Sequence, residues 1–232
     1  MKCPAVKYFA LSEANSHSLI SQTCLAYLLQ FDTDWDTLPS TSPLVQYAAH
    51  NWILHVQSGS TDESKSLPTL TLILNLFEPG CCAFTNWARV FDSQLTWPNE
   101  LPGIEDIGSP LSYAAQGGLE RVVHHLLEKG VDVNAQGGRY GNGLQAASYE
   151  GHGAIVRLLL EKGADVNAQG GQYGNALQAA SSRGRDAIVN LLLEKGADVN
   201  ARGGQYGNAL QAASYEGHGA IVKLILDRKS VV

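Results

Sequence analysis

The sequence has no segment of the kind that directs a chain out of the cell or into a membrane. No Asn-x-Ser/Thr sequon occurs, and the N-terminus lacks the charged region and sustained apolar stretch of a signal peptide. The longest apolar run, around residues 70–77, is too short to span a bilayer. We therefore expect a soluble intracellular protein, in the cytoplasm or in the nucleus.

The sequence also lacks the common motifs of enzymes and metal sites. It contains no G-x-x-x-x-G-K-[ST] loop that would cradle phosphates and no G-x-S-x-G nucleophile elbow. Adjacent residues on a helix diverge, so His124 and His125 cannot share one metal. The four cysteines have no C-x-x-C spacing, and we interpret them as buried thiols: Cys3, Cys24, Cys81 and Cys82. The sequence thus predicts no catalytic residue, no cofactor and no metal.

Positive charge is scarce, which bears on the class of partner. The net charge is -6, and Lys and Arg are scattered, mostly in Glu-Lys pairs such as Glu161–Lys162. A nucleic-acid-binding face would need basic residues gathered in a patch or stripe. We therefore expect no nucleic-acid partner, and we interpret the charged pairs as solvated helix ends.

What the chain does have is a repeat in its second half. Leu111, Leu144, Leu177 and Leu210 recur every 33 residues, and tyrosine recurs at the same interval. A fixed period of this size is typical of stacked units that cannot bury their apolar faces alone. The chain is therefore predicted to contain an α-solenoid.

The unit from Tyr173 to Gly204 shows how one repeat is built. Asn175 can cap a first helix, and Gly184 can end it in the left-handed conformation. A second helix follows with a stretch too apolar for a surface helix, and Gly196 ends it in the same way. The residues from 198 to 205 then form a projecting glycine-rich turn, in which Asn200 can bond its own backbone.

The first hundred residues predict a separate helical domain. Helices fit residues 16–31, 43–57, 68–77 and 82–91, and residues 58–66 read as an exposed polar loop. Trp35, Trp52 and Trp87 are interpreted as packing residues rather than as a ligand cage. The fold class is therefore all-α, with a helical domain at 1–103 and the repeats at 104–232.

Two segments give the repeats a family resemblance. Gly-Ala-Asp-Val-Asn at 163–167 and 196–200 resembles the ankyrin hairpin signature, and Ser-Pro-Leu-Ser-Tyr-Ala-Ala at 109–115 resembles the start of an ankyrin helix pair. The resemblance implies four units at about 107–139, 140–172, 173–205 and 206–232. It also implies binding of another protein. Asn stands where the family has a capping Thr and Gln where it has His, so hydrogen bonding between turns is either rebuilt through Gln or lost.

The last unit departs from the others, because residues 227–232 read Asp-Arg-Lys-Ser-Val-Val where earlier units continue to a closing turn. Its polar end suits a capping repeat, and the alternative is an array that stops within a unit.

A narrower resemblance concerns residues 24–32, residues 43–52 and the amino-acid sequence of the hairpins. These are similar to the linker and ankyrin tail of fungal NACHT-type signalling ATPases, which implies that residues 6–9 end a winged-helix segment. The ATPase motif itself is absent, so on this resemblance the chain is a fragment or a short paralogue.

The candidate interaction surface lies beside the projecting turns. Tyr and Arg are residue types that anchor interfaces, although the repeated tyrosines can equally be structural and pack against neighbouring turns. The candidate residues are Arg139, Tyr140, Tyr149, Glu150, Gln172, Tyr173, Ser182, Arg183, Gln205, Tyr206, Tyr215 and Glu216.

The sequence leaves three functions open: a protein-interaction module, a sensor or regulatory piece of a NACHT-like ATPase, and an enzyme or accessory protein with a small-molecule pocket between the helical domain and the repeats. The first is our prediction, and it involves no enzyme activity and no membrane.

Overall fold

The computed structural model describes residues 13–32, 42–59, 63–96, 103 and 106–229, and for 63–66 and 93–96 it describes the backbone alone. The chain divides into two compact units, Met1–Pro98 and Asn99–Val232. Over the described ranges the structure has twelve helices and no strand longer than a single bridge. This confirms the all-α prediction. The expected domain boundary at 103 lies beside positions that are not described.

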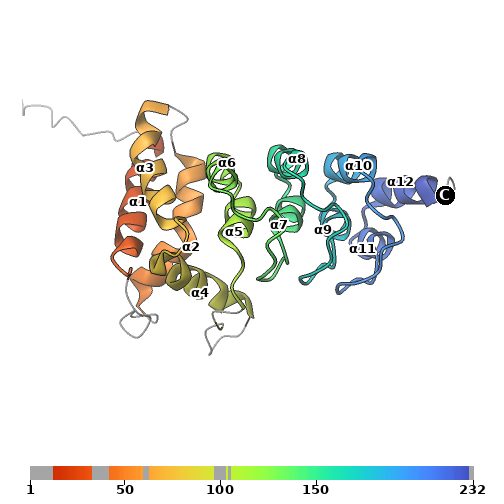
Figure 1. Cartoon of the computed structure of the whole chain (residues 1–232), viewed down its shortest axis with the longest axis horizontal. Coiled ribbons are helices and arrows are strands. Elements are labelled where there is room, and N and C mark those ends of the chain that lie inside the picture. The colour runs from red at the N-terminus through yellow and green to blue at the C-terminus, as the bar shows by residue number, and fades with distance from the viewer. Residues whose placement is uncertain (1–12, 33–41, 60–62, 97–102, 104–105, 230–232) are drawn as a thin grey trace, which may run out of the picture. The chain divides into compact units, whose positions relative to one another are not determined.

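The first unit, called the helical unit below, has four helices, which Figure 1 shows packed together. They are α1 (Glu13–Leu29), α2 (Pro43–Ser58), α3 (Glu63–Leu76) and α4 (Cys82–Thr96). Trp52 and Trp87 are both buried, with ring centroids 5.7 Å apart, and the Trp87 indole donates to the Ala49 carbonyl at 2.9 Å. Their role as packing residues is confirmed, and Trp35 lies outside the described residues.

Three expectations for the helical unit are corrected. The polar segment expected as a loop is helical from Glu63 onward, so Pro68 lies inside α3 rather than in its first turn. Proline is favoured in a first turn but does not mark where a helix begins. Among the cysteines, burial raises the pKa of the Cys24 thiol, whereas Cys82 is exposed. Helix α4 begins there because the Asp32 carboxylate accepts from the Cys82 backbone N–H at 2.9 Å.

The second unit, called the repeat array below, stacks four helix pairs. Figure 1 shows the first helices side by side in one row, with the second helices in another row above them. The first helices are α5 (Pro110–Gln116), α7 (Gly143–Glu150), α9 (Ala176–Ser182) and α11 (Ala209–Tyr215). The second helices are α6 (Glu120–Glu128), α8 (Gly153–Glu161), α10 (Asp186–Glu194) and α12 (Gly219–Lys229).

Small residues let the first helices approach one another. Ala146, Ala147, Ala179 and Ala180 are fully buried, so neighbouring backbones come close. The second helices bury branched side chains such as Val156. Each repeat therefore completes its core only against the next one, as expected for a solenoid.

The predicted caps form as expected. Asn142 accepts from the Gln145 backbone N–H at 2.9 Å, and the Gln145 side chain accepts from the Asn142 N–H at 2.9 Å, which makes a capping box. The Gln145 amide also donates to the Gly174 carbonyl of the next repeat at 3.0 Å. Hydrogen bonding between turns is thus rebuilt through Gln, the first of the two alternatives.

Histidines and an arginine bond the repeats to one another through backbone carbonyls. His152 Nε2 bonds the Gln116 carbonyl at 3.0 Å, and His218 Nε2 bonds the Ser182 carbonyl at 3.2 Å. These turn histidines therefore have a structural role. In the third repeat Arg185 takes this position and its guanidinium donates to the Glu150 carbonyl at 2.6 Å.

Candidate interaction surface beside the hairpins

The projecting turns are joined into a continuous frame by their backbones. Within each turn a bridge closes the hairpin, for example Gly170 N–H to Gly174 O at 2.8 Å. Between turns, Gln172 N–H donates to the Arg139 carbonyl at 2.8 Å, and Gln205 N–H donates to the Gln172 carbonyl at 2.9 Å. Neighbouring hairpins therefore hold one another in place.

Asparagine side chains tie the same frame from one turn to the next. Asn134 accepts from Asp165 N–H at 2.8 Å, and Asn167 accepts from Asp198 N–H at 2.8 Å. The sequence predicted that the Asn200 side chain bonds its own backbone, and the structure shows a different hydrogen bond in this turn. The Asp198 carboxylate accepts the Asn200 backbone N–H at 2.8 Å.

The hairpin tips carry a row of polar side chains. The Arg139 guanidinium donates to the Gln172 amide oxygen at 2.7 Å, and the Gln172 amide donates to the Gln205 oxygen at 2.6 Å. All three residues reach solvent. The arrangement presents donors and acceptors at the spacing of the repeats.

Tyr140, Tyr173 and Tyr206, called the tyrosine ladder below, stack behind this row. Ring centroids lie 6.0 Å apart for the first pair and 6.4 Å apart for the second, with nearly parallel planes. Tyr140 is 7% exposed and Tyr173 is 4% exposed, whereas Tyr206 is half-buried. The first two rings are therefore held between hairpins and present little surface to a partner.

Two hydroxyls of the ladder are paired with glutamates. Tyr140 donates to Glu150 at 2.9 Å, and Tyr206 donates to Glu216 at 2.5 Å. Burial, with the Glu150 charge, raises the pKa of Tyr140 well above its usual value. The hydrogen bond to Glu216 raises the pKa of Tyr206 to about 12. Both hydroxyls therefore stay protonated and act as donors at neutral pH.

The third repeat departs from this pattern because Ser182 and Arg183 replace the Tyr-Glu pair of its neighbours. Tyr149 crosses over to Tyr173, with ring centroids 4.5 Å apart, and the Arg183 guanidinium lies 4.9 Å above the Tyr149 ring. Burial and the hydrogen bond with Tyr149 raise the pKa of Tyr173. The charge at this position therefore alternates over the last three repeats: Glu150, Arg183, Glu216.

An open groove of about 530 Å³ lies beside the last repeat. Gln205, Tyr206, Gln211 and Tyr215 line it. Tyr215 is 81% exposed, the largest exposure of any large hydrophobic side chain over the described positions. Gln211 was not among the predicted surface residues, although it is exposed here and its equivalents Gln145 and Gln178 are buried.

The structure sorts the candidate residues by accessibility. Ser182 is buried and its hydroxyl donates to the Ala179 carbonyl at 2.9 Å. Together with Tyr140 and Tyr173 it faces the interior of the array. The candidates that reach solvent are Arg139, Tyr149, Glu150, Gln172, Arg183, Gln205, Tyr206, Tyr215 and Glu216.

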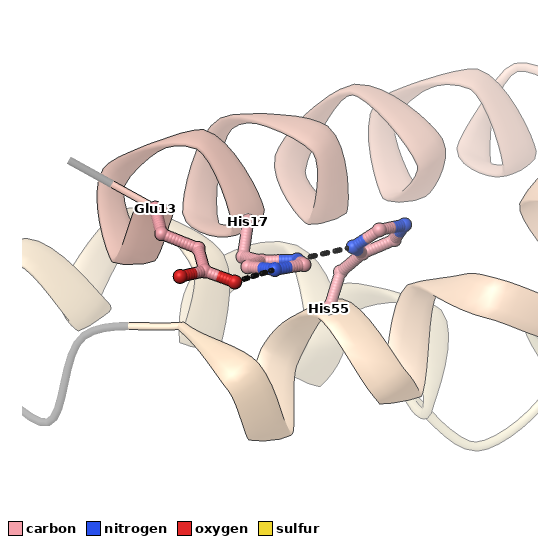
Figure 2. A network of polar contacts seen from close by, with 3 residues as sticks. All are labelled: Glu13, His17 and His55. Atoms are coloured by element: carbon pink, nitrogen blue, oxygen red, sulfur yellow. Dashed lines mark hydrogen bonds and ion pairs between the residues drawn. The ribbon is translucent and has the colours of Figure 1, made fainter. Parts of the chain in front are cut away.

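A second polar cluster lies in the helical unit, and no sequence motif indicated it. Figure 2 shows His17 of α1 between Glu13 and His55 of α2. The two Nδ1 atoms are 2.7 Å apart, and Glu13 lies 4.0 Å from the other ring nitrogen of His17. The Tyr47 hydroxyl lies 2.8 Å from His55 Nε2. Because the two His17 nitrogens face opposite sides, Glu13 and His55 cannot bind one ion together with His17.

Across the part of the chain that is described, no three His, Cys, Asp or Glu residues gather as a metal site would require. No helix found there is both long and apolar enough to cross a membrane.

A fungal protein shares part of this sequence. The chain is 40% identical over 157 residues to a protein of Monascus ruber named azaphilone pigments biosynthesis cluster protein L. The match covers 60% of this chain and 32% of the relative, so the chain spans about a third of the relative's length.

A family model agrees with the helix pairs and hairpins described above. The model for ankyrin repeats, in three copies, matches residues 99–170 and 144–232. Together these matches cover more than half of the chain, and they include every helix pair of the repeat array. The chain belongs to the ankyrin-repeat family.

Proposed function

We propose that this chain is a protein-interaction module that binds another protein on the hairpin side of its repeat array. The observation that carries the proposal is the set of solvent-reaching side chains on a frame whose hairpins are hydrogen-bonded to one another. A frame that is already ordered loses little conformational freedom on binding, which favours affinity.

The two kinds of candidate residue have different roles in this proposal. Tyr140 and Tyr173 position the hairpins, because their rings are buried between neighbouring turns. Arg183, Tyr215 and Glu216 contact the partner, because they are exposed and because Tyr and Arg often anchor interfaces. The alternating charge at this position favours a partner with complementary alternating charges over one of uniform sign.

A capture experiment with a surface variant tests this assignment. The variant Arg183→Ala/Tyr215→Ala/Glu216→Ala removes exposed contacts and keeps the buried rings of Tyr140 and Tyr173. The matched control Arg157→Ala/Glu161→Ala removes exposed charges from α8, on the second-helix side of the array. A photo-crosslinking residue at position 215 identifies what lies against the surface, and the same residue at 157 gives the background.

We expect one protein to crosslink from position 215 and to be captured by the native chain and the control but not by the surface variant. Circular dichroism and thermal unfolding must first show that both variants fold like the native chain. Equal capture by both variants would contradict the proposal.

The similarity to known proteins does not indicate where this chain is located, whether it is catalytic, or which protein it binds. The Monascus relative's name refers to a pigment biosynthesis cluster and states no activity. We keep the cytoplasm or the nucleus as the proposed location, on composition alone, and we assign the chain no catalytic role.

The alternative function, a regulatory piece of a NACHT-type ATPase, is supported only by the sequences of residues 24–32, residues 43–52 and the hairpins. The described parts of these segments lie in and beside α1 and α2. Binding of the helical unit to an isolated NACHT ATPase domain would favour it over an independent interaction module.

A further inference from the structure

The third repeat differs from its neighbours in one short segment. Residues 182–186 read Ser-Arg-Gly-Arg-Asp, where the second and fourth repeats both read Tyr-Glu-Gly-His-Gly. Helix α9, which ends at Ser182, packs between α7 and α11 (Figure 1), so the segment lies within the array. Two arginines therefore stand here where the neighbouring repeats have a glutamate and a histidine.

The two arginines act in different ways on Tyr149 of the preceding repeat. The Arg185 guanidinium donates to the backbone carbonyl of Tyr149 at 3.3 Å and to that of Glu150 at 2.6 Å. The Arg183 guanidinium lies 4.9 Å from the centroid of the Tyr149 ring, over its face. The same ring also contacts Tyr173, with centroids 4.5 Å apart. Arg185 thus fixes the end of α7, and Tyr149 gives Arg183 a fixed ring on which to stack.

Arg183 is held in this way without using its charge. Its side chain is exposed. Among the described residues no carboxylate forms an ion pair with its guanidinium, and no acceptor bonds the guanidinium N–H groups. A guanidinium stacked on a ring keeps its edge free, and that edge presents donors in a planar fork that matches the two oxygens of a carboxylate. The pair Arg183 and Tyr149 is therefore a preformed site for an anion.

The neighbouring charges decide which anion fits. The equivalent positions of the repeats before and after are Glu150 and Glu216. Adjacent rings of the tyrosine ladder lie 6.0 Å and 6.4 Å apart, so neighbouring repeats approach here within the screening length of about 8 Å at physiological salt. The two glutamates therefore disfavour a doubly charged phosphate ester and a run of acidic residues. They attract basic residues on both sides of one acid.

We propose that Arg183, stacked on Tyr149, binds a single side-chain carboxylate of the partner protein, an Asp or Glu that lies between basic residues. The basic residues pair with Glu150 and Glu216. The inference rests on the proposed function and names the chemistry of the partner at one position of that surface. Arg183 sets the specificity there, because a neutral or basic residue of the partner would leave its donors without an acceptor.

A peptide selection on the full chain tests the proposal. Phage-displayed random peptides are selected on the native chain after depletion on the Arg183→Gln chain, so that the recovered peptides depend on Arg183. The matched control is Arg157→Gln, which removes an exposed arginine from α8 on the second-helix side. Circular dichroism and thermal unfolding first establish that both variants fold like the native chain.

We expect the recovered peptides to carry one acidic residue between basic residues. Fluorescence anisotropy should show at least tenfold weaker binding for Arg183→Gln and for the peptide with Ala in place of its acid, and no change for Arg157→Gln. Combining Arg183→Gln with the alanine peptide should weaken binding no further than either change alone, because a direct contact is lost only once. Arg183→Lys should also bind more weakly, since an ammonium keeps the charge but not the planar fork.

Three results of this experiment would overturn the proposal: no recovered peptide, recovered peptides without an acidic residue, or losses that add in the combined measurement. Tighter binding of a peptide with phosphoserine in place of its acid would overturn it too, because the site would then suit a phosphorylated partner.

The outcome is separable from that of the proposed function. If partner capture is lost in the surface variant with three substitutions but unchanged in Arg183→Gln alone, the interaction surface stands and Arg183 does not bind a carboxylate of that partner. If the acidic peptides bind at Arg183 but no protein is captured on the hairpin side, the carboxylate site stands and the proposed function falls.

Discussion

At the residue scale, the closeness of neighbouring hairpins depends on single glycines. Gly171 has φ +60°, and a Cβ there would lie 2.2 Å from the Tyr140 carbonyl carbon. Gly204 has the same relation to Tyr173, at 2.3 Å. Any side chain at these positions meets backbone, which cannot turn away as a flexible side chain does.

We predict that Gly171→Ala destabilises the repeat array by roughly 2–5 kcal/mol, because left-handed strain adds to the overpacking. Gly163→Ala is the matched control. Gly163 also has a positive φ, +90°, but nothing lies within 4 Å of its Cβ position. Its cost should be about 1–2 kcal/mol, from strain alone. Urea unfolding followed by circular dichroism measures both, and equal losses would show that the hairpins do not approach so closely.

The sequence located the tyrosines of the surface but not their exposure. The 33-residue interval identified Tyr140, Tyr173 and Tyr206 as equivalent. Whether each ring is buried depends on the turn that follows it, which only the packed array supplies. For the same reason Gln211 was not recognised, since its sequence context is that of Gln145, yet Gln211 is exposed where Gln145 is buried.

At the element scale, α1 and α2 meet at a pair of histidines that is sensitive to protonation. His17 and His55 face each other at 2.7 Å, a separation that accommodates one proton between the two Nδ1 atoms. Burial, followed by the nearby His17 charge, lowers the pKa of His55. The other titratable groups at the cluster are Glu13 beside His17 and Tyr47 beside His55.

We predict that the helical unit loses stability as the pH falls from 7 to 5. Since the folded state lowers the pKa of His55, the unfolded chain binds the proton more readily. The stability is therefore complete above the unfolded value of about 6.5 and is lost as the pH falls through the folded value. All four tryptophans lie in residues 1–98, so tryptophan fluorescence during urea unfolding reports on this unit.

The His17→Gln variant should flatten this pH dependence, because it removes one of the two facing imidazoles. His124→Gln, at an exposed position of α6, should leave it unchanged. A slope that is as steep in His17→Gln as in the native chain would rule the histidine pair out as its source.

The helices themselves were largely predictable because capping residues and apolar spacing are local signals. Helix α2 begins at Pro43 as predicted, and the Asn-capped helices of the repeats begin directly after their caps. Helix α4 was predicted from Cys82, but its cap is Asp32, 50 residues earlier. No local pattern reveals such a partner. The helical residues before Pro68 were not predicted, because their polar, Ser-rich sequence is typical of a loop.

At the scale of the whole molecule, the repeats of the array share a structure but differ in their number of neighbours. Helices α7 and α9 each pack between two first helices, whereas α11 packs against one within the described chain. Leu226 of α12 is 49% exposed, while the equivalent Leu193 of α10 is 9% exposed. In a linear array, stability is the sum of such nearest-neighbour terms.

We predict that amide hydrogen exchange is slowest in α7 and α9 and fastest in α12, because local opening at the last repeat breaks only one junction. Hydrogen exchange measured by mass spectrometry at neutral pH reads this gradient directly. Uniform protection across the four repeats would mean that the array opens only as a whole.

The junctions between repeats have a consequence for how such a protein changes over generations. Gln145 and Gln178 donate to backbone carbonyls of the following turn, which every polypeptide possesses whatever its side chains. Deletion or insertion of a whole 33-residue unit therefore rejoins surfaces that already fit. The number of repeats can drift without loss of folding, while the exposed side chains on each unit vary independently and supply new combinations for selection.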